Sequence, residues 1–187
     1  MNVPIDISNV VIKTERLILR PWKDSDLQDF YEYASVDGVG QMAGWLPHKD
    51  IEESRQIMNR FISEKKTFAL EFNGKVIGSL GIEEYSEKEM PEYSDKLGRE
   101  IGYVLSKAYW GQGLMPEAVQ AVVKYLFEQV RVDFIACGHF TDNHQSMRVQ
   151  EKCGFVHYKL VKYETHYGQV KDCWISVIER ATFNSKV

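Results

Sequence analysis

The residues at positions 109–119, YWGQGLMPEAV, have the composition of an anion-binding turn at the start of a helix. Gly111 and Gly113 carry no side chain, so a bulky anion can approach the main chain closely. Pro116 fits the first turn of a helix, and Glu117 suits the positive end of the helix dipole. Because the first N–H groups of a helix have no intrahelical partner, this turn favours a phosphate ligand.

Two familiar phosphate motifs do not fit this turn. A P-loop requires Lys and then Ser or Thr after its last glycine, whereas Leu114 and Met115 follow Gly113. A dinucleotide-binding fingerprint requires a third glycine where Pro116 stands. The turn therefore indicates an anion other than a nucleoside triphosphate or NAD, and a glycine-containing turn without a ligand is the alternative.

The elements that must position this turn follow one another without a linker or an internal repeat. Alternation and turn signals predict strands at residues 16–20, 67–72, 75–81, 99–105, 132–140, 155–164 and 170–178, with Asn73-Gly74 as a hairpin turn. Helical spacing predicts four helices, which start near Asp24, Asp50, Pro116 and Asn143. The anion-binding turn thus joins a strand to a helix.

Two further segments have features that the structure can test. The apolar face of the first helix is predicted to comprise Leu27, Phe30, Tyr31 and Ala34. Residues 86–98 are polar and break the periodicity, so they predict a surface loop in a position to cover a site.

Composition limits the classes of function. The 187 residues, 44% hydrophobic and 27% charged, suit a single domain spanning 1–187. The formal charge of −4 argues against nucleic-acid binding. Asp6 interrupts the start of the chain, and no apolar run reaches membrane-spanning length, so we expect a cytoplasmic protein without a membrane partner. Three cysteines without CxxC spacing indicate reduced thiols.

Three separated segments resemble a known family. TERLILRPWKDSDL, REIGYVLSKAYWGQGLMPEAVQAVVKYLF and TDNHQSMRVQEKCGF look like motifs of the GNAT superfamily of acetyl-CoA-dependent N-acetyltransferases, in its ribosomal-protein-acetyltransferase (RimJ/RimL-like) branch. The resemblance covers residues 14–178. It implies an α/β fold with a central, mostly antiparallel, twisted sheet that opens into a V near Leu105 and is flanked by about four helices. It implies acetyl-CoA as the cosubstrate and no metal.

The resemblance assigns the cofactor-binding residues one by one. The superfamily loop Q/R-x-x-G-x-G/A begins here at Trp110, with its glycine at Gly113 and its last small residue at Met115. Trp110 and Met115 depart from the general pattern, although both are usual in this branch. The resemblance implies that main-chain N–H groups hold the pyrophosphate of coenzyme A and that Gly111 shapes the turn. The holding residues are Gln112, Gly113, Leu114 and Met115.

The pantetheine arm is expected on the strand before the loop. In the family this strand separates from its neighbour, so the backbone groups of Tyr103, Val104 and Leu105 would pair with the pantetheine amides. Asn143 and Ser146, at the start of the following helix, correspond to residues beside the pantetheine and the thiol. Asn143 as a mere N-cap and Ser146 as a surface serine are the alternatives.

The reaction requires few protein groups. An amine attacks the thioester directly, so the site must deliver a neutral amine, stabilise an oxyanion and ease departure of the thiolate. We nominate Glu100 as the general base, Ser146 as the donor to the thiolate, and a backbone N–H near Val104 or Leu105 for the oxyanion. The alternative for Glu100 is a structural ion pair with Arg99 or another cation.

The residues that contact the acceptor amine are the part of the site that the sequence defines least. Trp45, His48, His166 and Tyr167 are expected substrate contacts, while Cys137, His139 and His144 form a weak metal or nucleophile pattern. The resemblance favours a protein N-terminal amine. Small antibiotic or polyamine-type amines, and a coenzyme A-binding sensor without turnover, are the alternatives. We expect a monomer or a homodimer.

Overall fold

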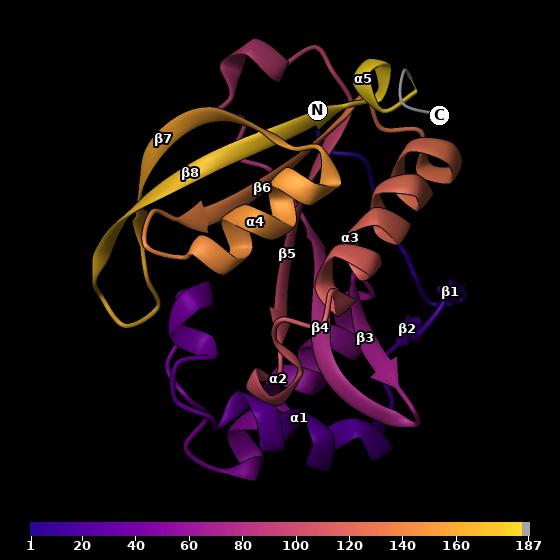
Figure 1. The fold of residues 1–187 in the computed structure, drawn as a ribbon, viewed down its shortest axis with the longest axis vertical. Helices are drawn as coiled ribbons and strands as arrows, with labels where there is room; N and C mark the ends of the chain where they lie inside the picture. Colours follow the sequence, from indigo (N-terminus) through magenta and orange to yellow (C-terminus); the bar gives the residue numbers. More distant parts are fainter. Residues whose placement is uncertain (185–187) are drawn as a thin grey trace.

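The computed structural model describes residues 1–184 and arranges them around one eight-stranded sheet (Figure 1). The strand order is β1-β2-β3-β4-β5-β6-β8-β7. The strands are β1 (Ile12–Lys13), β2 (Leu17–Pro21), β3 (Thr67–Phe72), β4 (Lys75–Glu83), β5 (Gly98–Leu105), β6 (Phe134–Phe140), β7 (Val156–Glu164) and β8 (Val170–Glu179). Within the described residues, neighbouring strands are antiparallel except β5 and β6, which are parallel. This confirms the predicted α/β fold with a mostly antiparallel sheet.

The helices cover both faces of the sheet (Figure 1). They are α1 (Leu27–Ala34), α2 (Ile51–Glu64), α3 (Leu114–Tyr125, continued by the π-helical residues Leu126–Val130), α4 (His144–Cys153) and the short α5 (Arg180–Asn184). Helices α1 and α2 pack on one face together with Ala69, Val76 and Val104, whereas α3 lies on the other face. No helix among residues 1–184 is long and apolar enough to cross a membrane.

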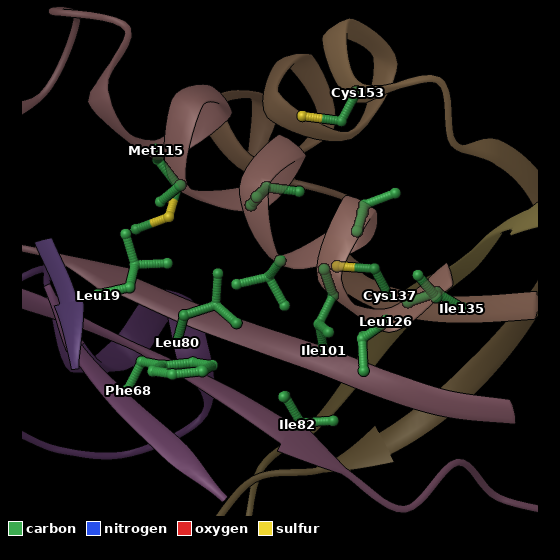
Figure 2. Packing of buried hydrophobic residues seen from close by; sticks show 14 of the residues in the cluster. Leu19, Phe68, Leu80, Ile82, Ile101, Met115, Leu126, Ile135, Cys137 and Cys153 are labelled. Carbon is green, nitrogen blue, oxygen red and sulfur yellow. The ribbon is translucent and has the colours of Figure 1, made fainter. Parts of the chain in front are cut away.

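The largest core lies between the sheet and α3 (Figure 2). Leu19, Phe68, Leu80 and Ile82 point from the strands toward Met115 and Leu126 of α3, and Cys153 of α4 closes the same cluster. These side chains are at least nine-tenths buried. Because burial of each large apolar side chain contributes about 1.5–3 kcal/mol, this cluster fixes α3, and with it the turn at its start, against the sheet.

The sheet opens between β5 and β6. Their parallel pairing runs only from Gly98 with Phe134 to Ile101 with Cys137, and beyond that point the two strands diverge (Figure 1). The opening therefore begins at Gly102, earlier along β5 than the V predicted near Leu105. Strands β4 and β5 remain paired as far as Leu105, so only one edge of β5 is freed.

The first helix begins later than its sequence pattern predicts. Asp24 starts a 3₁₀ turn (Asp24–Asp26) and does not cap α1 with its side chain. Asp26, which is buried, instead accepts hydrogen bonds from the guanidinium of Arg20. On α1 itself Leu27, Phe30 and Ala34 are buried as predicted, whereas Tyr31 is only partly buried and Tyr33 is buried instead.

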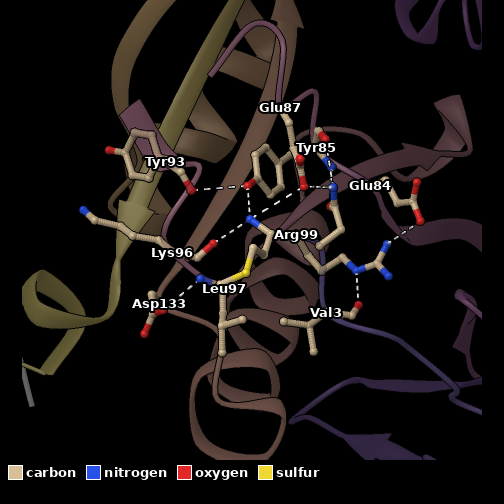
Figure 3. Close-up of polar contacts among 11 residues, drawn as sticks. Val3, Glu84, Tyr85, Glu87, Tyr93, Lys96, Leu97, Arg99 and Asp133 are labelled. Atoms are coloured by element: carbon tan, nitrogen blue, oxygen red, sulfur yellow. Dashed lines mark hydrogen bonds and ion pairs between the residues drawn. The ribbon is translucent and has the colours of Figure 1, made fainter. Parts of the chain in front are cut away.

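Residues 86–98 form a largely exposed loop, as the sequence predicts, that a few apolar side chains anchor. Met90 is fully buried, and Tyr85 and Tyr93 pack against Phe134 at the base of β6. Figure 3 shows this region from close by, with Asp133 accepting a hydrogen bond from the N–H of Leu97. The segment lines no part of the cavity described below. The polar composition of this segment predicted a loop positioned to cover a site, but its apolar residues anchor it at the start of β5, away from the cavity.

Candidate active site

A cavity of about 430 Å³ occupies the opening between β5 and β6. It runs past the free edge of β5, the turn before α3 and the first turns of α4. The lining residues on these elements are Gly102, Tyr103, Val104, Leu105, Tyr109, Trp110, Gly111, Gly113, Leu114, Met115, Pro116, Gly138, Asn143, Gln145, Ser146, Arg148, Val149 and Lys152. Val39, Met42 and Ala43 close it from the side of α1. Ten of the predicted catalytic and cofactor-binding residues thus share one cavity.

The turn before α3 depends on two left-handed glycines. Gly111 has φ of +75° and Gly113, the N-cap residue of α3, has φ of +76°, a region that other residues adopt only with strain. Leu114 and Met115 bury their side chains in the core, so only their main chain faces the cavity. Gln112 does not line the cavity with its side chain, which donates to the carbonyl of Ala108 at 3.3 Å.

Arg16, just before β2, braces this turn. Its Nη1 donates to the carbonyl of Gln112 at 2.9 Å, and its Nε donates to Glu117 Oε2 at 2.7 Å. Partial burial opposes ionisation of Glu117, but hydrogen bonds from Thr14 and Arg16 lower its pKa. A guanidinium 3.5 Å from the Cβ position of Gly113 also adds positive charge beside the start of α3.

The free edge of β5 offers backbone groups to a ligand. The N–H of Ser106 donates to the carbonyl of Ile77 on β4 at 2.7 Å. Because backbone groups along a strand point alternately to its two edges, the N–H and C=O of Val104 face β4, whereas those of Tyr103 and Leu105 face the opening. The indole of Trp110 donates to the carbonyl of Leu105 at 2.8 Å. Tyr103 N–H, Tyr103 C=O and Leu105 N–H are therefore the groups directed at the cavity.

Glu100 lies on the face of the sheet that carries α1 and α2, beside the wall of the cavity. A Cβ at Gly138, which lines the cavity, would lie 3.6 Å from Glu100 Oε1. Burial, and secondarily the charge of Glu83, raise the pKa of Glu100 to about 7. A carboxylate with such a pKa can accept a proton near neutral pH.

The alternative of an ion pair with Arg99 does not apply to Glu100. The Arg99 side chain points to the other face of β5, where it donates to the carbonyl of Val3 and lies 3.9 Å from Glu84 (Figure 3). Among the described residues, no salt bridge includes Glu100. The carboxyl group therefore has an elevated pKa and no neutralising cation.

Asn143 and Ser146 both line the cavity at the start of α4. Asn143 Oδ1 accepts from the N–H of Ser146 at 3.1 Å, which is the N-cap bond that the sequence predicts. Its Nδ2 donates across the cavity wall to the carbonyl of Met42 at 3.3 Å. Asn143 is thus a cap and a cavity residue at once.

The four expected substrate contacts lie outside the cavity. His48 is buried, its Nδ1 is 2.7 Å from Ser54 Oγ, and burial lowers its pKa. Trp45 packs on Gly40 and on the His48 ring. His166 donates its backbone N–H to Gly44 at 2.8 Å, with Tyr167 next to it in the β7–β8 turn. Through these contacts His48 and His166 hold segment 40–45, whose Met42 and Ala43 line the cavity.

Sequence reasoning missed two groups of cavity residues. Val39, Met42 and Ala43 sit in and beside a 3₁₀ turn that no periodic pattern reveals. Arg148, Val149 and Lys152 follow Asn143 and Ser146 at helical spacing, and that spacing was a usable signal.

The weak metal pattern does not assemble. Cys137 and His139 lie on one face of β6 as expected, and both are hydrogen-bonded to Gln150 of α4. Burial raises the pKa of the Cys137 thiol well above its ordinary value. Within residues 1–184, no three His, Cys, Asp or Glu side chains gather in a way that could hold a metal ion.

Comparisons with known proteins agree with this geometry. The model of the acetyltransferase (GNAT) domain matches residues 16–156. The uncharacterized N-acetyltransferase YoaA of Bacillus subtilis (strain 168) is 32% identical over 152 residues, which are 78% of this chain and 82% of YoaA. An acetyltransferase (GNAT family) from Bacillus anthracis shares the fold, with a TM-score of 0.79, 25% identity and coverage of 91% of this chain and 98% of that chain.

A more distant solved structure shares the fold alone. The spermidine N-acetyltransferase from Vibrio cholerae, in complex with CoA and spermine, has a TM-score of 0.72 at 18% identity and covers 90% of this chain and 98% of that chain. Together, the family match over most of the chain and the related N-acetyltransferases identify the class. The protein belongs to the GNAT acetyltransferase family and is an acetyl-CoA-dependent N-acetyltransferase.

Proposed function

We propose that the protein transfers the acetyl group of acetyl-CoA directly to a protein N-terminal amine in a ternary complex. One observation carries the proposal: a single cavity runs from the glycine turn along the free edge of β5 to Gly102 and Gly138, beside Glu100. Attack by the amine, stabilisation of the oxyanion and departure of the thiolate can therefore all take place in one continuous cavity.

The proposal places coenzyme A by charge and hydrogen-bonding capacity. The N–H groups at Gly113, Leu114 and Met115 suit the pyrophosphate, since they stand at the positive end of α3. Arg148 and Lys152, exposed on α4 at the cavity, suit the remaining phosphate charge. The pantetheine amides would pair with Tyr103 and Leu105.

The chemistry would take place where β5 and β6 separate. Glu100 takes a proton from the attacking amine, and its raised pKa suits that role near neutral pH. The N–H of Tyr103 faces the opening beside Gly102 and would donate to the oxyanion, whereas the N–H of Val104 faces β4. Ser146 donates to the sulfur as the thiolate departs.

The acceptor would enter from the side of α1. Two hydrogen bonds tie segment 40–45 to the other half of the sheet, from Asn143 Nδ2 to Met42 and from His166 N–H to Gly44. Met42 and Ala43 on this segment line the cavity. Segment 40–45 would therefore border the entrance through which the first residue of an extended chain presents its amine.

Thermal unfolding with acetyl-CoA, and with NAD and ATP as controls, tests the cosubstrate site. A ligand present at 100 times its Kd adds about 2.7 kcal/mol of stability, so we expect a higher Tm with acetyl-CoA alone. Free thiol released from acetyl-CoA is then measured with a peptide bearing a free N-terminus, the same peptide acetylated, spermidine and an aminoglycoside. Release with the free peptide alone supports the proposal.

Each other outcome has a defined meaning. Release with spermidine or the aminoglycoside alone would replace the protein acceptor with a small amine. A Tm rise without release from any amine would favour a coenzyme A-binding sensor. The three free, buried cysteines support the reducing, cytoplasmic compartment that this proposal includes.

A further inference from the structure

A hydrogen-bonded group of side chains surrounds Ser146 behind the cavity wall. The hydroxyl of Tyr103, on β5, lies 2.9 Å from Ser146 Oγ. Gln150, one turn further along α4 and fully buried, directs its Nε2 to the carbonyl of Gly138 at 3.1 Å and reaches Ser146 Oγ at 3.5 Å. The group therefore links the two strands that flank the opening.

Gln150 is held in one orientation. Its Oε1 lies 2.9 Å from Nδ1 of the buried His139, and its Nε2 lies 3.2 Å from Cys137 Sγ. Because the Gly138 carbonyl can only accept, the amide nitrogen of Gln150 must be the group that faces Gly138 and Ser146, and Oε1 then faces His139 Nδ1. Ser146 Oγ therefore faces a donor on this side.

The phenol of Tyr103 is the nearer neighbour of the same oxygen, and in that contact either hydroxyl can donate. The carbonyl of Ser146 lies farther from the phenol, at 3.3 Å. Burial raises the pKa of Tyr103 well above its ordinary value, so the phenol keeps its proton. When the Ser146 hydrogen turns into the cavity that Ser146 lines, the Ser146 oxygen is left to accept from Tyr103.

We infer that Tyr103 is a positioning residue that acts through Ser146: its phenol holds the Ser146 oxygen, so that the Ser146 hydroxyl points at the departing thiolate and donates a hydrogen bond to it. This inference rests on the proposed function and adds a residue whose side chain that function does not use. In this proposal the backbone of Tyr103 binds the cosubstrate, and its phenol positions the Ser146 hydroxyl that faces the leaving thiolate.

The step balances in protons and electrons. The C–S bond breaks with its electron pair on sulfur, and the thiolate accepts a hydrogen bond from the Ser146 hydroxyl while the Ser146 oxygen accepts one from Tyr103. Both hydroxyls keep their protons, and the thiolate takes its proton from solvent as coenzyme A leaves. Glu100 returns the proton of the amine to solvent, so each turnover yields one amide and one thiol.

A double-mutant cycle tests the inference in the full-length protein. Wild type, Tyr103→Phe, Ser146→Ala and the double variant are compared by kcat for thiol release and by acetyl-CoA affinity from calorimetry. Tyr125→Phe is the matched control, since Tyr125 packs on the same core from α3 but lies outside the cavity. Tyr103→Phe keeps the ring and removes only the hydroxyl.

We expect kcat to fall about 100-fold in Ser146→Ala and about 10-fold in Tyr103→Phe. Because Tyr103 acts only through Ser146, the double variant should match Ser146→Ala within about twofold, with acetyl-CoA affinity unchanged throughout. Losses that multiply in the double variant would overturn the inference, as would a loss of affinity at constant kcat in Tyr103→Phe. A wild-type protein that releases no thiol with any amine would instead refute the proposed function, and this inference with it.

Discussion

Glu83 of β4 and Glu100 of β5 stand directly opposite each other in register, on the side of the sheet from which the acceptor would enter. Burial and this facing carboxylate raise the pKa of Glu100 to about 7. We expect kcat/KM of the wild type to rise with pH through about 7, as Glu100 loses its proton. In Glu100→Gln this rise with pH should disappear, and kcat should fall about 100-fold. An unchanged rate and pH profile would remove Glu100 as the base.

Replacement of Glu83 should shift the acid limb of the pH–rate profile without abolishing activity. Glu83→Gln removes the secondary cause of the raised pKa and leaves burial, the larger one. We expect the acid limb of the pH–rate profile to shift to lower pH, with the plateau rate within about threefold of wild type. Glu84→Gln is the control, because the Glu84 side chain is 74% exposed. Equal shifts in both variants would contradict a specific effect of Glu83.

The stability of the protein should also report the buried carboxyl group. A carboxyl whose pKa is higher in the folded state than its ordinary value of 4.5 makes the folded state less stable as pH rises through the interval from 4.5 to about 7. Glu100→Gln should therefore match the wild type near pH 4 and be more stable by up to about 3 kcal/mol at pH 8. Urea unfolding at the two pH values measures this difference.

Gly111 and Gly74 have the same backbone conformation, so alanine at each position separates an effect on stability from an effect on acetyl-CoA binding. Gly111 and Gly74 have φ of +75° and +78°, and a Cβ at either position would meet no atom within 4 Å. Gly111→Ala and Gly74→Ala should each cost about 1 kcal/mol of stability, because alanine resists this conformation. Only Gly111→Ala should also lose most of the Tm rise with acetyl-CoA. Equal rises in the two variants would show that the turn tolerates alanine when loaded.

Arg16 should contribute to cosubstrate affinity rather than to the chemical step. Arg16→Met removes the hydrogen bond to the carbonyl of Gln112 and the ion pair with Glu117. We expect the acetyl-CoA Kd to rise about tenfold, since such bonds to a charged group contribute about 1.5–3 kcal/mol, while kcat changes less than about twofold. Arg55→Met, which breaks an exposed ion pair with Glu52 on α2, controls for loss of a surface arginine. A loss confined to kcat would contradict this role.

Local rules predicted those parts of the site that depend on neighbouring residues in the chain. The turn at Gly111 and Gly113 and the cap at Asn143 follow from the conformations that glycine and asparagine favour. Alternation along β5 also separates Arg99 from Glu100, because successive residues of a strand point to opposite faces. The ion pair considered for these two residues was therefore testable from the sequence.

The remaining features depend on how distant segments meet. The start of α1 was predicted too early because Asp26 is hydrogen-bonded to Arg20, a contact that helical periodicity does not encode. The position of the opening depends on where β5 and β6 stop pairing, which is a property of strand twist rather than of any residue pattern. The proposed role of the Tyr103 side chain depends on how β5 lies against α4, whereas the sequence predicted only a backbone contact to pantetheine for this residue.

Segment 40–45 and the turn braced by Arg16 are held by different hydrogen bonds. Segment 40–45 is tied to Asn143 and to the β7–β8 turn, whereas the turn is tied to Arg16 at the start of α3. Substitutions in segment 40–45 can therefore alter one end of the cavity and leave the glycine turn intact. This scaffold is suited to divergence in which the acceptor changes while the acetyl donor stays the same.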